Sequence, residues 1–170
     1  MGRGAPESLA LAGGDKSLLN KFMALEKNIM TSHSISAHLA RELLAAAQKQ
    51  ASEMGLAVSI CILDAAGRLK AFVSMDDAAP ISHETAVKKA KMALGFGMPT
   101  GEDWYSFIKN DPILLHGVTQ LPDFILLGGG SPLKWNQHVI GAIGVSGGHY
   151  KQDETCVTAA IQLLNQLVST

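Results

Sequence analysis

A glycine-rich segment at 144–148 has the residue types that could hold a nucleophile or an anion. It reads Gly-Val-Ser-Gly-Gly and matches the G-x-S-x-G pattern of a serine placed between a strand and a helix. A hydrolase of that type also needs a histidine after its acid, and none follows Asp153. The pattern therefore predicts a tight turn that depends on glycine. Because backbone N–H groups at a helix start can bind a carboxylate or phosphate, Ser146, Gly147 and Gly148 are candidate ligand-binding residues.

Histidines are the next candidates for chemistry. No pair has the spacing of a multi-histidine zinc site, so the sequence does not predict one. A lone histidine is most often a hydrogen-bonding surface or core residue, but it can also act as an acid, a base or a haem ligand. His149 follows the glycine-rich turn, and Ser146 and His149 are the candidate catalytic residues if the chain is an enzyme. The six histidines are His33, His38, His83, His116, His138 and His149.

Lys89 is a candidate anion-binding residue. Three lysines, at 88, 89 and 91, lie on one predicted helix and cannot all face solvent if that helix also has a buried face. We expect Lys89 to point towards the end of the sheet, where a ligand anion could pair with it. The alternative is a solvated basic face. A second glycine-rich segment, 128–131, lacks the lysine of a phosphate-binding loop and predicts a turn.

The first half of the chain has clear signals for the elements that position these residues. Apolar residues recur at helical spacing over 35–54, and Ser34 or Ser36 can cap this helix. An apolar run at 56–63 predicts a strand buried on both faces. Asp and Gly in the turn 64–67 then predict a hairpin with a second strand.

The second half of the chain predicts further helices and strands. Ser82 is the expected N-cap of the helix that carries Lys89, which ends near Ala93. Short turns between neighbouring strands favour antiparallel pairing, so we expect an α+β fold: a layered α–β–α domain with a central antiparallel sheet. The remaining expected segments are a helix at 101–110, an irregular stretch at 111–122, strands at 124–127 and 138–145 separated by a turn at 128–132, and a helix at 151–168.

The composition is that of one globular domain. The chain has 170 residues, 47% of them hydrophobic, and a formal net charge of −1. The absence of a basic excess and an aromatic content of 5% argue against nucleic-acid binding. Cys61 and Cys156 predict buried, reduced thiols, and no membrane span or signal peptide is recognisable, so we expect a cytoplasmic protein that does not bind membranes. We expect residues 1–30 to form an N-terminal extension and 31–170 a single domain.

Several short segments together resemble the GlcG/HbpS family, which includes the C-terminal domain of PduO proteins. The resemblance covers about residues 34–168, and the segment from Gly141 is its most specific part. It implies a compact α–β–α domain of profilin-like arrangement, homo-oligomers, and haem binding in some members. The segments are Asp64-Ala65-Ala66-Gly67, Met75-Asp76-Asp77-Ala78, Lys89-Ala90, and Gly141-Ala142-Ile143-Gly144-Val145-Ser146-Gly147 followed by Asp153-Glu154.

The chain also departs from the family pattern. Ser74 stands where the family often has arginine, and Met92 stands where it often has threonine. Both changes remove polar groups from the expected pocket, so they predict a changed ligand. In some members a histidine of the N-terminal region ligates haem iron, and His38 is the nearest counterpart. With Lys89 and the turn 146–149, Met75 and His83 complete the candidate ligand-binding residues.

Two functions remain open at this point. The first is a small-ligand-binding oligomer of the GlcG/HbpS type that takes haem and has an accessory or sensory role. The second is a cofactor-free isomerase, lyase or hydratase acting on a small organic acid or enolisable carbonyl compound. In that enzyme His149 would move the proton, while Lys89 and the N–H groups of the turn would hold the anion. A purely structural subunit is a third alternative.

Overall fold

The computed structural model describes residues 21, 25 and 28–168. The chain divides into two compact units, Met1–Ser32 and His33–Thr170, and the second unit carries the fold. Most of the expected N-terminal extension lies outside the described residues. In chain order, the elements are α3 (Ala37–Glu53), β1 (Ser59–Asp64), β2 (Leu69–Ser74), α4 (Pro80–Phe96), α5 (Glu102–Ile108), α6 (Pro112–Gly117), the 3₁₀ helix η1 (Val118–Gln120), β3 (Gly130–Trp135), β4 (His138–Ser146) and α7 (Tyr150–Val168).

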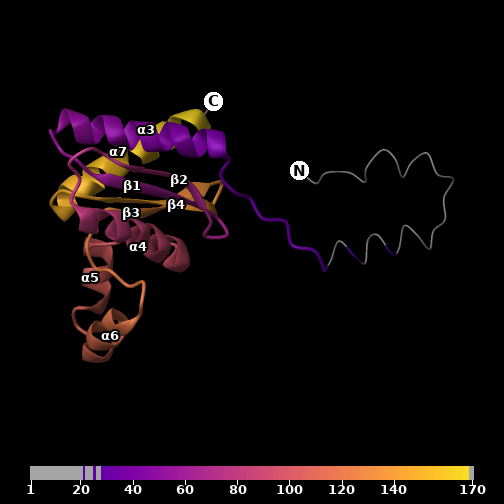
Figure 1. The fold of residues 1–170 in the computed structure, drawn as a ribbon. Helices are drawn as coiled ribbons and strands as arrows, with labels where there is room; N and C mark the ends of the chain where they lie inside the picture. Colours follow the sequence, from indigo (N-terminus) through magenta and orange to yellow (C-terminus); the bar gives the residue numbers. More distant parts are fainter. Residues whose placement is uncertain (1–20, 22–24, 26–27, 169–170) are drawn as a thin grey trace. The chain divides into compact units, whose positions relative to one another are not determined.

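The second unit is a three-layered α–β–α domain. Its sheet has the order β2-β1-β4-β3, and every neighbouring pair is antiparallel. Helices α3 and α7 lie on one face of the sheet and α4 lies on the other, whereas α5 and α6 extend beyond the α4 side (Figure 1). The predicted α+β fold is therefore confirmed.

The central strand β1 links the two hydrophobic cores. All six of its residues are buried, as the continuous apolar run predicts. Ile60 and Ile62 belong to the core beneath α3 and α7, and Cys61 and Leu63 belong to the core beneath α4. Because burial disfavours a thiolate, it raises the pKa of Cys61 to about 12.

Two local signals are confirmed as the sequence predicts them. The Ser36 hydroxyl caps α3 by accepting a hydrogen bond from the Leu39 N–H at 3.1 Å. In the β1–β2 turn, Asp64 Oδ1 accepts hydrogen bonds from the N–H groups of Ala66 and Arg68, both at 2.9 Å. Short-range hydrogen bonds of this kind are set by the local sequence, so they are predictable from it.

The predicted start of α4 is wrong. The helix begins at Pro80 instead, because proline lacks an N–H and its fixed φ fits the first helical turn. Ser82 therefore lies inside the helix, where its hydroxyl donates to the Ala79 carbonyl at 2.6 Å and contacts the Ser59 hydroxyl at 2.8 Å. The helix also continues past Ala93 to Phe96.

The predicted strand at 124–127 and turn at 128–132 are also wrong. The place beside β4 belongs to β3, so 124–127 forms a loop over Met92 and has no ladder partner. Glycines 128–130 lead into β3. The true hairpin turn is at Asn136 and Gln137, which have φ values of 45° and 68°.

The stretch expected to be irregular, 111–122, contains α6 and η1. Asp111 caps α6 because its Oδ1 accepts hydrogen bonds from Ile113 and Leu114 N–H at 2.9 and 3.1 Å. Trp104 of α5 packs against Phe96 and Phe124 in a small satellite core. In the described part of the chain, no helix is both long enough and apolar enough to cross a membrane.

For the last helix, α7, the sequence predicts buried positions at Val157, Ile161, Leu164 and Leu167 or Val168. Val157 and Leu164 are buried, and Ile161 is partly buried against the same core. Leu167 and Val168 are exposed instead, at 49% and 37%. These two side chains line an open groove described below.

Candidate functional site

The glycine-rich turn 146–149 joins β4 to α7 and lies against the second glycine-rich segment, 128–130. The Val145 N–H donates to the Gly129 carbonyl at 2.7 Å, which ties the two segments together. They are far apart in the sequence, but β3 and β4 are neighbours, so their ends meet. The segments thus form one junction at the end of the sheet.

The turn depends on glycine, as predicted. Gly147 has a φ of 152°, and a Cβ at this position would lie 2.5 Å from the Ala57 carbonyl oxygen. A side chain would therefore push the turn away from the chain that enters β1. The next N–H, that of Gly148, donates to Asp153 Oδ1 at 3.0 Å. This donor is thus engaged within the protein.

A buried ion pair stabilises the junction. Lys89 Nζ donates to Asp153 Oδ2 at 2.7 Å and to the Val145 carbonyl at 2.9 Å. Both side chains are almost completely buried, with exposed fractions of 1% and 2%. Burial lowers the pKa of Lys89 and raises the pKa of Asp153, while their mutual attraction opposes both shifts. Lys89 points to the sheet end as expected, but its partner here is Asp153, and its role towards a ligand stays a prediction.

Glu154 adds a second acidic group to the junction. A Cβ on Gly128 would overlap its carboxylate, so the glycine allows this side chain to lie against the backbone. Partial burial raises the pKa of Glu154, and the nearby carboxylates of Asp103 and Glu102 raise it further, whereas Lys151 and Lys89 lower it. The junction therefore carries more negative than positive charge towards α5.

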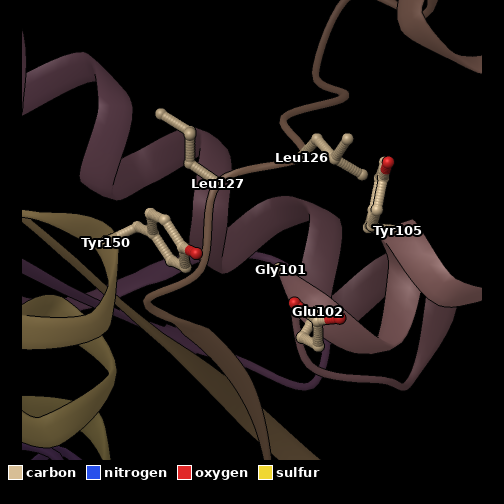
Figure 2. A pocket seen from close by; sticks show the side chains of 6 residues that line it. All are labelled: Gly101, Glu102, Tyr105, Leu126, Leu127 and Tyr150. Atoms are coloured by element: carbon tan, nitrogen blue, oxygen red, sulfur yellow. The ribbon is translucent and has the colours of Figure 1, made fainter.

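A cavity of about 270 Å³ opens beside the junction. Figure 2 shows Tyr150 and Leu127 on one side of it, Leu126 and Tyr105 on the other, and Glu102 on the α5 backbone below. The sequence does not indicate this cavity, because it predicts a strand at 124–127. Its lining residues are Gly101, Glu102, Tyr105, Leu126, Leu127 and Tyr150.

The structure does not bring all predicted site residues to this junction. His149 is exposed, its ring lies against Tyr150, and its Nδ1 accepts a hydrogen bond from the Lys151 N–H at 3.4 Å. Met75 directly follows the edge strand β2 at the same end of the sheet, with β1 between that strand and β4. His83 stacks on Phe72, with ring centroids 4.3 Å apart. Ligand binding by these residues and acid–base catalysis by Ser146 and His149 stay predictions.

His38 lies on the surface of α3. Its side chain is 78% exposed, and its Nε2 lies 3.4 Å from Glu42 Oε1. A haem ligand needs an apolar slot beside it, and so exposed a side chain does not have one. Its role as an iron ligand stays a prediction.

A second cavity, of about 350 Å³, combines a histidine with apolar walls. We call it the His33 groove. The His33 ring lies 4.9 Å from the Trp135 ring at 73°, and 4.9 Å from the His138 ring. The sequence predicts the hairpin turn at 128–132. It therefore gives no reason to expect His33 and His138 side by side. The groove is lined by His33, Ser34, Ile35, Ser36, Leu39, Trp135, Ile140, Leu164, Leu167 and Val168.

Within the described residues, no group of three or more His, Cys, Asp or Glu side chains could hold a metal ion. Cys61 and Cys156 are both buried and unpaired, as predicted.

Comparisons with known proteins place this chain in a family. The family described as "Haem degrading protein HbpS-like" matches residues 35–162. Protein GlcG of Escherichia coli is 32% identical over 112 residues, which cover 66% of this chain and 81% of GlcG. The corrinoid adenosyltransferase PduO of Salmonella typhimurium is 31% identical over 134 residues, covering 78% of this chain and 39% of PduO.

Solved structures agree with the sequence matches. Klebsiella pneumoniae protein ORFY is 28% identical with a TM-score of 0.73, covering 81% of this chain and 94% of ORFY. A double mutant of Streptomyces reticuli HbpS is 26% identical with a TM-score of 0.72, covering 81% and 91%. A complex of PduOC with haem is 28% identical with a TM-score of 0.67, covering 76% and 94%. The GlcG/HbpS resemblance is confirmed, and the chain belongs to the HbpS-like family.

Proposed function

We propose that this chain binds haem in the His33 groove. The observation that carries the proposal is an imidazole at a groove whose other walls are mostly apolar. The haem complex of PduOC, a protein of the same fold, supports haem as the ligand.

The residues of the His33 groove fit a haem. A haem site requires one axial ligand and an apolar slot for the porphyrin. Seven of the ten lining residues are apolar, and His33 supplies the nitrogen. The groove of about 350 Å³ is near the lower end of small-molecule sites, so one porphyrin edge would remain in solvent.

Each part of the groove has a separate task in this proposal. His33 would hold the iron, and its edge-to-face contact with Trp135 would orient the imidazole. Leu39, Leu164 and Leu167 would exclude water from the porphyrin face. Once bound, the haem would supply an iron centre for electron transfer or oxygen chemistry.

A charge placed in the groove tests this location without disturbing a core. Leu167 lines the groove and Leu121 lines a different cavity, and both are 49% exposed. In a hemin titration followed in the Soret region, we expect saturable binding of one haem per chain. Leu167→Glu should weaken hemin binding by at least about tenfold, because a porphyrin in the groove would remove water from the new carboxylate. Leu121→Glu should leave hemin binding unchanged. Equal affinities for the two variants would rule out this groove.

The proposal also includes a homo-oligomeric assembly in the cytoplasm, with an accessory or sensory role. Exposed apolar side chains on α5 and α6, among them Phe107 and Ile113, support an assembly because they lie unburied in one chain. The unpaired thiols of Cys61 and Cys156 support a reducing compartment. Light scattering that gave the mass of a single chain would contradict the assembly.

A further inference from the structure

His33 and His138 hold two imidazole rings side by side at the edge of the His33 groove. Their ring centroids are 4.9 Å apart, and the rings are inclined by 46°. Both side chains are exposed, so an ion from solvent can reach them. We propose that these two histidines together chelate a divalent transition-metal ion, with Cu²⁺ as the preferred ion.

The separation of the rings fits a two-nitrogen chelate. A metal–imidazole bond of about 2.0–2.1 Å puts each ring centroid about 3.2 Å from the metal. Two centroids 4.9 Å apart then subtend an angle of about 100° at the metal, between the square-planar and tetrahedral values. Rotation about the soft outer torsion of each histidine can aim the nitrogens at the ion.

The surrounding structure holds the two rings in place. His138 begins β4 directly after the hairpin turn, and Trp135 ends β3 as its cross-strand partner. His33 packs edge-to-face on that tryptophan at 73°. The Ile35 N–H donates to the Ile140 carbonyl at 2.8 Å, which fixes the chain of His33 against β4. The two rings are therefore held close together before an ion arrives.

The chemistry of the donors selects the class of ion. Neutral imidazole suits Cu²⁺, Ni²⁺ and Zn²⁺, and among divalent ions a nitrogen site binds Cu²⁺ most tightly. No third His, Cys, Asp or Glu joins the pair in the described residues, so water would occupy the other positions. A site with open positions can exchange its ion, unlike a closed structural zinc site.

The inference uses the groove of the proposed function but does not depend on haem. His33 would serve both ligands, so a bound haem should block the metal ion. His138 belongs to the metal site alone. The His138→Ala variant therefore separates the two proposals.

The test is a calorimetric titration of the full chain with CuSO₄, free of haem. We expect one Cu²⁺ per chain at this site, with partial quenching of tryptophan fluorescence on binding, because Trp135 contacts His33. His33→Ala and His138→Ala should each weaken it by at least about tenfold, and His38→Ala, a matched change of an exposed histidine, should not. Copper binding that is unchanged in both His33→Ala and His138→Ala would be adventitious and would overturn the inference.

Hemin titrations of the same variants distinguish a failure of the haem proposal from a failure of the metal-site proposal. If both variants lose copper while only His33→Ala loses hemin, both proposals stand. If His33→Ala loses copper but keeps hemin, the metal site stands and the haem site is wrong. If His33→Ala loses hemin while copper binding survives in both variants, the haem site stands and the metal site is wrong.

Discussion

At the scale of single residues, the buried pair of Lys89 and Asp153 explains why the glycine junction has a defined shape. Each charge lies in a place where water cannot compensate it, and each is compensated by the other. Asp153 also accepts from the Gly148 N–H, and Lys89 donates to the Val145 carbonyl, so the pair holds both sides of the turn. Removing one partner should therefore cost more than removing both.

We predict that Lys89→Met and Asp153→Leu each lower the free energy of unfolding by about 3–5 kcal/mol, because each leaves a buried charge unpaired. The double variant should be closer to the wild type than either single variant. Urea unfolding of the four proteins measures this coupling. Losses that simply add would show that the two charges do not interact.

The raised pKa of Glu154 makes the free energy of unfolding depend on pH in a predictable direction. The folded protein binds this proton more tightly than the unfolded chain, so the stability it contributes is present below the unfolded value of 4.5. That stability is lost as the pH rises through the higher folded value. In urea unfolding between pH 4 and 7, Glu154→Gln should therefore gain stability relative to the wild type as the pH rises. A stability difference between Glu154→Gln and the wild type that does not change with pH would contradict this assignment. Glu53→Gln on α3 is the control.

At the scale of elements, the close approach of α4 to β4 depends on Gly144. A Cβ there would overlap the Ala86 carbonyl and meet the Ala90 N–H at 2.6 Å. We predict that Gly144→Ala lowers the free energy of unfolding by about 1–3 kcal/mol, because the helix must move away. Gly95→Ala, on the same helix with open space around it, should instead gain about 0.5–1 kcal/mol. Thermal melts compare them, and equal effects would contradict the packing argument.

The elements also show what a single sequence can and cannot predict. The helix over 35–54 and the hairpin around Asp64 follow from periodicity and turn chemistry, which act over a few residues. The strand β3 was missed because Gly130 and Pro132 are poor local strand formers. It forms because Gly130 lies against the Lys89 carbonyl and pairs with β4, which are long-range contacts.

At the scale of the whole unit, the local parts of the candidate site are predictable from the sequence and the long-range parts are not. The glycine-dependent turn at 146–149 was predictable, because its signal lies within four residues. The partner of Lys89 was not, since Asp153 comes from a helix 64 residues further on. The His33 groove combines the start of α3, the β3–β4 hairpin and the end of α7. Only the fold brings these segments together.

The most direct test of the account is a hemin titration of His33→Ala beside His38→Ala. The two histidines lie five positions apart, but only His33 lines an apolar groove. We predict a saturable, red-shifted Soret band in the wild type and in His38→Ala, and its loss or marked weakening in His33→Ala. An intact band in His33→Ala, with loss in His38→Ala, would contradict the account and place the iron on the surface of α3.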